Sequence, residues 1–230
     1  MSTVSVQSAV RTYDQGPIPV RALDGVDFTL ESGEFAALMG PSGSGKTTLL
    51  NLIGGLDTAT EGRVFVDGTD VGALDRTGRS DLRRDRIGFI FQSYNLVPVL
   101  TARENTEFVM MLQGVPAAER ARRATEMLAA VGLAGMEDRR PSELSGGQQQ
   151  RVAVARAIAT KPAIVLADEP TANLDSETKA DLIAMMRRLN EEEGVTFLFS
   201  THDPEVIAAA RRVITLRDGR IANDERRGTD

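Results

Sequence analysis

Apolar residues in this chain gather in short runs that alternate with longer segments of helical periodicity. The runs at 34–39, 87–91, 163–167 and 195–200 have the length and composition of buried strands. Segments such as 176–193 repeat apolar residues every three or four positions, which predicts helices between these strands. Because strands alternate with helices, the pattern predicts an α/β fold with a mainly parallel sheet covered on both faces.

Two parts of the chain depart from this alternation. The N-terminal part carries two strand-like segments, 4–13 and 21–30, and the second alternates apolar with polar residues. From 101 to 132 the pattern is helical, and Thr101 with Glu104 has the spacing of a capping box. This stretch predicts a helical lobe inserted into the sheet domain.

Composition and charge narrow the classes of protein. The 230 residues are 41% hydrophobic and 26% charged, as in an ordinary globular protein. The net charge of −6 argues against non-specific nucleic-acid binding, and the lack of cysteine excludes disulfides and thiolate metal sites. No apolar run approaches the ~20 residues that cross a bilayer, and the N-terminus lacks the pattern of a secretion signal. We therefore expect a cytoplasmic protein with no nucleic-acid partner, unstructured only at 224–230.

The stretch from 40 to 48 fits the phosphate-binding loop pattern G-x-x-x-x-G-K-[ST]. Glycines let the backbone turn its N–H groups toward an anion, and a helix beginning near Gly45 adds its first amides. Lys46 would bring its charge to the outer phosphates, and the Thr47 hydroxyl would ligate Mg²⁺. The predicted nucleotide-binding residues of this loop are Gly40, Pro41, Ser42, Gly43, Ser44, Gly45, Lys46, Thr47 and Thr48.

Polar side chains also follow three of the predicted strands. Asp168 and Glu169 come directly after one strand, and Gln92 comes directly after another. His202, the only histidine, follows a third. Because the carboxyl ends of parallel strands meet at one edge of a sheet, we expect these side chains beside the phosphate-binding loop, although solvated acids and a structural histidine remain the alternative.

In that position each of these side chains suits a different task. Asp168 suits the surroundings of Mg²⁺, and Glu169 suits a general base that polarises an attacking water. His202 would contact a phosphate or position the water. Gln92 offers an uncharged donor and acceptor to water or metal.

A second glycine-containing helix start lies at 144–148, with the sequence Leu-Ser-Gly-Gly-Gln. A serine cap followed by glycines at a helix N-terminus can bind an anion, although a capped helix alone would look the same. A single nucleotide does not need two such sites from one chain.

Together these motifs resemble, in order and spacing, those of the ATP-binding subunits of ABC transporters. The motifs that carry the resemblance are 40–48, Gln92, 144–148, Asp168 with Glu169, 172–175 and His202. The resemblance implies a phosphate-loop ATPase fold with an N-terminal antiparallel β subdomain. It also implies a single domain over 1–230, with the ATPase core at 1–92 and 148–230 and a helical signature subdomain at 93–147.

The resemblance also assigns roles to single residues. It implies that Tyr13 stacks on adenine, that Gln92 senses Mg²⁺ and the membrane partner, and that Glu169 is the catalytic base. Metal contacts are expected from Thr47, Gln92 and Asp168, and catalytic roles from Glu169, His202 and Gln92. ATP and Mg²⁺ are the implied cofactors.

Other positions are expected to act between two copies of the chain. In the implied head-to-tail dimer around two ATP molecules, residues 145–148 would face the nucleotide of the other copy. The residues of this set are Ser145, Gly146, Gly147 and Gln148, and Asp175 would communicate across the dimer.

Residues 51–57, 91–98 and 141–144 resemble the lipoprotein-release and macrolide-export branch of the family. This implies an ATPase subunit that drives a transmembrane permease, of export or lipoprotein- or peptide-extrusion type, from the inner face of the cytoplasmic membrane. The alternatives are an importer ATPase, or an ABC-type ATPase that serves a cytosolic assembly or cell-division complex.

Overall fold

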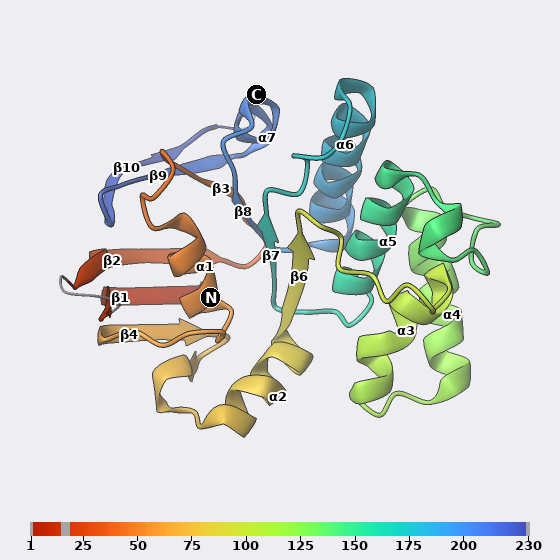
Figure 1. The fold of residues 1–230 in the computed structure, drawn as a ribbon, viewed down its shortest axis with the longest axis horizontal. Helices are drawn as coiled ribbons and strands as arrows, with labels where there is room; N and C mark the ends of the chain where they lie inside the picture. The colour runs from red at the N-terminus through yellow and green to blue at the C-terminus, as the bar shows by residue number, and fades with distance from the viewer. Residues whose placement is uncertain (1, 15–18, 229–230) are drawn as a thin grey trace.

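The computed structural model describes residues 2–14 and 19–228, which form two sheets surrounded by helices (Figure 1). The antiparallel sheet has the order β2 (Val20–Glu31), β1 (Ser2–Tyr13), β4 (Glu61–Val66) and β5 (Thr69–Asp70). The larger sheet has the order β10 (Arg220–Arg226), β9 (Arg212–Arg217), β3 (Phe35–Met39), β8 (Phe197–Ser200), β7 (Ile164–Asp168) and β6 (Ile87–Phe91). Neighbouring strands from β9 to β6 are parallel, and β10 is antiparallel to β9. The predicted mainly parallel sheet and N-terminal antiparallel β subdomain are confirmed.

Helices occupy the segments between the strands of the parallel sheet. Within the described ranges they are α1 (Lys46–Ile53), α2 (Arg76–Arg86), α3 (Ala102–Leu112), α4 (Ala117–Ala130), α5 (Gly146–Ile158), α6 (Ser176–Glu193) and α7 (Pro204–Ala209), with 3₁₀ turns at Val71–Ala73 and Pro141–Glu143. The antiparallel sheet and the α3–α4 pair lie at opposite ends of the molecule (Figure 1). None of the helices in these ranges combines the length and hydropathy needed to cross a membrane.

The parallel sheet is buried on both faces because its strands alternate between two hydrophobic clusters. Phe35 of β3 belongs to a cluster with Leu182 of α6 and with residues of α5. Its neighbours Ala36 and Leu38 belong to the opposite cluster, together with Leu49 of α1 and the antiparallel sheet. Side chains of successive strand residues point to opposite faces, so the nearly uninterrupted apolar runs of the sequence are explained.

The register of the parallel strands brings their carboxyl ends into line. Leu38 of β3 pairs with Ser200 of β8, and Ser200 pairs with Asp168 of β7. Asp168 in turn pairs with Phe91 of β6. The loops that follow these residues therefore start from one edge of the sheet, as the sequence predicted.

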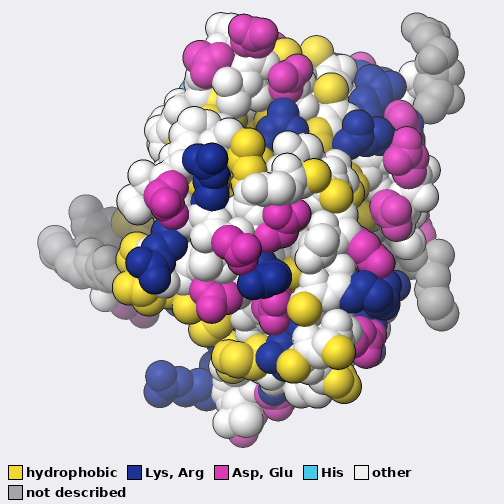
Figure 2. Space-filling model, turned by 90° about the vertical axis from the view of Figure 1, so that its right-hand side faces the viewer, with side chains coloured by type: hydrophobic (Ala, Val, Ile, Leu, Met, Phe, Trp, Pro, Cys, Tyr) yellow, Lys and Arg dark blue, Asp and Glu magenta, His cyan; other side chains and the backbone are white. Residues whose placement is uncertain are grey.

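The helical end of the molecule carries a mixed surface. In Figure 2 positive and negative side chains are interspersed with hydrophobic ones over this face. On α4, Arg122 donates two 2.8 Å hydrogen bonds to Glu126, and Arg123 pairs with Glu119. Charges that pair one turn apart stabilise a solvated helix face and leave no large field of one sign.

The C-terminal end is ordered further than expected. Residues 224–230 were predicted to be unstructured, but β10 continues to Arg226 and pairs with β9. Residues 229–230 lie outside the described residues. The prediction was wrong for 224–226 because these charged residues have no apolar alternation, and ion pairs hold the strand instead.

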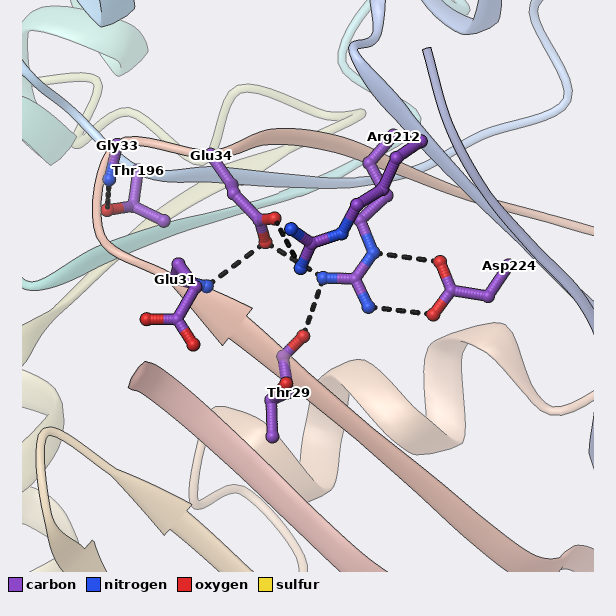
Figure 3. Close-up of polar contacts among 8 residues, drawn as sticks. Thr29, Glu31, Gly33, Glu34, Thr196, Arg212 and Asp224 are labelled. Atoms are coloured by element: carbon purple, nitrogen blue, oxygen red, sulfur yellow. Dashed lines mark hydrogen bonds and ion pairs between the residues drawn. The ribbon is translucent and has the colours of Figure 1, made fainter. Parts of the chain in front are cut away.

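Those ion pairs converge on Arg212, whose side chain is 6% exposed (Figure 3). Its guanidinium donates to both carboxylate oxygens of Asp224, at 2.8 and 2.7 Å. It also donates to Glu34, at 2.9 Å, and to the Thr29 carbonyl, at 2.6 Å. The cluster therefore connects β10 to its neighbour β9 and to β2 of the antiparallel sheet. Hydrogen bonding by Arg212 holds the pKa of Asp224 below its usual value.

Substitution Asp224→Asn is expected to lower the free energy of unfolding by about 1 to 3 kcal/mol at pH 7, because a buried guanidinium loses a charged partner. A carboxylate with a lowered folded-state pKa stabilises the fold above its unfolded pKa, and this contribution disappears as the pH falls through the folded pKa. The difference from wild type should therefore shrink below about pH 4. Denaturant unfolding at several pH values measures it.

The matched control is Asp138→Asn, which removes an 80% exposed carboxylate paired with Arg103. An exposed pair contributes about 0 to 1 kcal/mol, so this variant should stay near wild type. Equal and small losses in both variants would contradict a structural role for the Arg212 cluster.

Candidate functional site

A polar cavity of about 490 Å³ opens at the edge where the parallel strands end. Residues from five parts of the chain meet there, and they are Ala22, Ser42, Gly43, Ser44, Gly45, Lys46, Thr47, Thr48, Gln92, Asp168, Glu169 and Ser200. The structure thus brings the phosphate-binding loop, the residue after β6 and the residues at the end of β7 into one place. Ala22 and Ser200 were not predicted, because neither belongs to a motif.

The loop between β3 and α1 has backbone geometry that requires glycine. Gly43 and Gly45 have φ of 77° and 103°, in the left-handed region. A Cβ at Gly45 would lie 2.5 Å from the Ala22 carbonyl oxygen, so the loop packs against β2 too closely for any side chain. This close approach fixes the position of the loop from which α1 begins at the edge of the cavity.

The start of α1 has the features of an anion-binding site. Gly45, the residue just before α1, has no side chain that could cap the helix. The first amides of α1 therefore stay open toward the cavity. The Lys46 ammonium donates to the carbonyls of Gly40 and Pro41, at 2.7 and 3.1 Å. The buried Ser44 hydroxyl has no partner in the described structure. A phosphate fits this cradle, because it supplies acceptors for the helix amides and the Ser44 hydroxyl and a charge opposite to that of Lys46.

Two carboxylates lie on the opposite side of the cavity. Burial raises the pKa of Asp168, although a hydrogen bond with Ser200 and the charge of Lys46 act against that rise. Glu169 has φ of 47°, which is uncommon for a residue other than glycine. A non-glycine residue in this region indicates that the surroundings determine the position of the side chain.

Glu169 is held at both carboxylate oxygens by the loop after β8. The Thr201 hydroxyl donates to Oε2 at 3.1 Å, and His202 Nδ1 lies 2.7 Å from Oε1. Glu169 is 19% exposed and His202 is 77% exposed. The predicted neighbours Glu169 and His202 are thus in contact, while the role of Thr201 was missed because one threonine at a strand end carries no distinct signal.

Gln92 lines the cavity and is fixed through its backbone. The Asn173 side chain donates to the Gln92 carbonyl at 3.0 Å. Beside it, the fully buried Gln150 of α5 donates to the Pro170 carbonyl at 2.7 Å. The segments after β6 and β7 are therefore connected to each other and to α5.

Residues 145–148 lie apart from this cavity. Ser145 caps α5, and its hydroxyl accepts from the Gln148 amide at 3.3 Å while Gln148 Oε1 accepts from the Ser145 amide at 2.9 Å. None of the four is among the residues that line the cavity. One copy of the chain therefore does not combine its two anion-binding helix starts in one pocket.

Asp175 lies beside this second helix start. It caps α6 and accepts hydrogen bonds from the amide and hydroxyl of Thr178, at 3.0 and 2.7 Å. These bonds lower the pKa of Asp175, the Thr178 amide being the largest cause. A Cβ at Gly147 would lie 2.3 Å from the Thr178 methyl carbon, so α5 and α6 begin in direct contact.

Tyr13 lies outside the cavity lining. Its hydroxyl donates to Asp57 at 2.9 Å, and the Arg11 guanidinium carbon lies 4.5 Å from the centre of its ring. Tyr13 pairs with Val20, two residues from the cavity-lining Ala22. The stacking role expected for Tyr13 stays a prediction.

Comparisons with known proteins give a consistent result. A profile of the family described as ABC transporter matches residues 23–172. The lipoprotein-releasing system ATP-binding protein LolD of Anaeromyxobacter dehalogenans is 48% identical over 96% of this chain and 93% of its own length. The macrolide export ATP-binding/permease protein MacB of Brucella melitensis is 46% identical over 96% of this chain but only 34% of its own length.

The fold is also shared with a solved structure. A dimeric, post-hydrolysis state of the ATP-binding cassette MJ0796 bound to ADP and Pi matches with a TM-score of 0.88 and 43% identity. The match covers 98% of this chain and 100% of that structure. The fold class and the family resemblance predicted from the motifs are confirmed. The chain belongs to the ABC transporter family, as one of its ATP-binding cassettes.

Proposed function

We propose that this protein binds and hydrolyses ATP and that it is the ATPase subunit of a transporter. The observation that carries the proposal is the cavity that combines a phosphate-binding loop with Asp168, Glu169 and Gln92. The relative MJ0796 has been solved with ADP and Pi, the products of this reaction. LolD and MacB are named as ATP-binding proteins of export and release systems, which favours the same branch here.

The residues of the cavity divide the work of hydrolysis. Amides of the loop and of the first turn of α1 bind the outer phosphates, and Lys46 turns from the loop carbonyls toward them. Glu169, oriented by Thr201 and His202, takes a proton from the attacking water. His202 has its other ring nitrogen free to meet a phosphate, because Nδ1 is directed at Glu169.

A divalent cation fits the same cavity. Asp168 is a half-buried carboxylate whose pKa is raised by burial, and a cation beside it would stabilise the charged form. Thr47, Asp168 and Gln92 would hold Mg²⁺, which when bound neutralises phosphate charge.

A complete site needs a second copy of the chain. Ser145–Gln148 form an anion-binding helix start that does not line the cavity holding the phosphate-binding loop of the same copy. In a two-fold head-to-tail dimer each such start faces the phosphates held by the other copy, and Asp175 lies at the boundary. Loss of the γ-phosphate removes the bridge between the copies, so the dimer opens after hydrolysis.

The permease contact is proposed at an apolar groove of about 420 Å³ between the parallel sheet and α3. Phe89, Phe108 and Leu112 line it, and Leu112 is 55% exposed. Arg156 lines the groove and also donates to the carbonyl of Tyr94, two residues after Gln92, at 2.9 Å. An amphipathic helix of the permease fits a groove of this kind, and Arg156 connects its position to the ATP cavity.

This arrangement supports the division of the chain predicted from the sequence. We assign 93–147 to a helical subdomain and 1–92 with 148–230 to the ATPase core, with α5 extending across the boundary. Bound to a permease through α3 and its groove, the protein would sit at the inner face of the cytoplasmic membrane.

Substitution Glu169→Gln is expected to lower kcat for ATP hydrolysis at least about 100-fold, because the amide cannot accept the proton from water. ATP binding should remain, so the ATP-bound dimer should accumulate. Steady-state phosphate release and size-exclusion chromatography with ATP measure the two effects. Glu192→Gln, at an exposed position near the C-terminal end of α6, is the matched control and should behave as wild type. Near-normal hydrolysis by Glu169→Gln would contradict the assignment of the general base.

Substitution Leu112→Asp is expected to abolish co-purification with the permease, because a charge cannot replace an apolar contact in the groove. ATPase activity of the isolated chain should not change. The matched control is Met111→Asp, because Met111 is 48% exposed on the same helix but does not line the groove. If both variants retain the permease equally, the groove is not the contact.

A further inference from the structure

Lys179 of α6 makes an ion pair that the proposed reaction does not use directly. Its ammonium lies 2.9 Å from Asp203 Oδ2 and 3.8 Å from Glu205 Oε1. The Asp203 side chain is 9% exposed, so its charge is largely removed from water. Among the described residues, Lys179 is the one cation that forms an ion pair with Asp203. Without it the buried carboxylate would keep an uncompensated charge, which is unfavourable.

Asp203 uses the rest of its carboxylate to fix the loop after β8. Oδ2 also accepts from the hydroxyl of Thr171, a fully buried residue, at 2.9 Å. Oδ1 accepts from the Glu205 amide at 3.0 Å and so caps α7. Lys179 neutralises a group that holds three segments of the chain together: the loop after β7, α6 and the start of α7.

The backbone of Asp203 connects this ion pair to the catalytic carboxylate. The Asp203 amide donates to Thr201 Oγ1 at 3.0 Å, and that hydroxyl donates to Glu169 Oε2 at 3.1 Å. A hydroxyl has one proton and rotates freely, so an N–H donor on its oxygen directs the proton toward the other partner. The position of Asp203 therefore sets the direction of the Thr201 hydroxyl.

Residues 201–203 thus act on both oxygens of Glu169, since His202 lies at the other oxygen, 2.7 Å away. The Thr201 amide also donates to the Leu38 carbonyl at 3.1 Å, on the strand that leads into the phosphate-binding loop. The ion pair between Lys179 and Asp203 connects residues 201–203 to α6, and Lys179 lies one helical turn after Asp175.

We propose that Lys179 is a positioning residue for ATP hydrolysis, which through Asp203 keeps Thr201 and His202 aimed at Glu169. Lys179 touches neither the nucleotide nor the water. It acts on the rate of the chemical step and not on the binding of ATP. This inference rests on the proposed ATPase function.

The test compares Lys179→Met, which keeps an unbranched side chain one atom shorter and removes the charge, with Lys179→Arg, which keeps the charge. In the purified full-length protein, Lys179→Met should lower kcat about 10-fold and leave KM for ATP within about two-fold, because a misdirected base slows the reaction without altering the phosphate cradle. Lys179→Arg should restore most of kcat. Lys161→Met, at another of the chain's three lysines, is the matched control and should match wild type.

A second variant separates positioning from a general loss of stability. If Lys179 acts through Asp203, adding Lys179→Met to Asp203→Asn should change kcat little further, because the buried charge that needs neutralising is already gone. If the two substitutions lower kcat independently, so that the double variant shows the product of the two losses, the proposal is overturned. A normal kcat in Lys179→Met would also overturn it. The proposal would also be overturned if KM for ATP rose by the same factor as kcat fell, or if the loss of kcat were explained entirely by a lower Tm.

The same assay separates this inference from the function on which it rests. Absence of ATP hydrolysis by the wild-type protein would contradict the proposed function. Hydrolysis by wild type together with a normal Lys179→Met variant contradicts only the role of Lys179.

Discussion

The common edge of four parallel strands is the constraint on which the site depends. Leu38, Ser200, Asp168 and Phe91 stand side by side in the register, so the loops that follow them must start together. The hydrophobic clusters on both faces of the sheet keep that register, because a shift by one residue would turn apolar side chains to the wrong face. Chemistry that needs groups from four segments of the chain is therefore fixed by the packing of the core.

In the proposed dimer, this edge supplies one half of each ATP site. The cavity collects the phosphate-binding loop and the acidic pair, while Ser145–Gln148 stay outside it on α5. The contact between Gly147 and Thr178 keeps the starts of α5 and α6 together, so the second anion-binding element and Asp175 form one surface. In the proposed dimer, two such halves would complete each other, and ATP bound between them would control association. The groove beside α3 then gives a second partner access to the segment after Gln92.

Much of this arrangement could be predicted from the sequence, because it depends on local patterns. Glycine spacing gave the loop, apolar runs gave the strands, and the capping box at Thr101 was found as expected. Contacts between distant residues could not be predicted in the same way. The network of Lys179, Asp203 and Thr201 depends on how α6 packs against the loop after β8, and the pairing of Arg212 with Asp224 orders a strand that has no apolar pattern.

In the proposed dimer, two copies of the chain share each ATP site. Ser145→Arg tests it directly, because an arginine at the start of α5 blocks the approach of the other copy and leaves the phosphate-binding loop of its own copy unchanged. This variant is expected to bind ATP as a monomer with wild-type affinity, to form no ATP-dependent dimer and not to hydrolyse ATP. Lys46→Ala, which weakens binding itself, gives the comparison. Full hydrolysis by the Ser145→Arg protein would contradict the shared site.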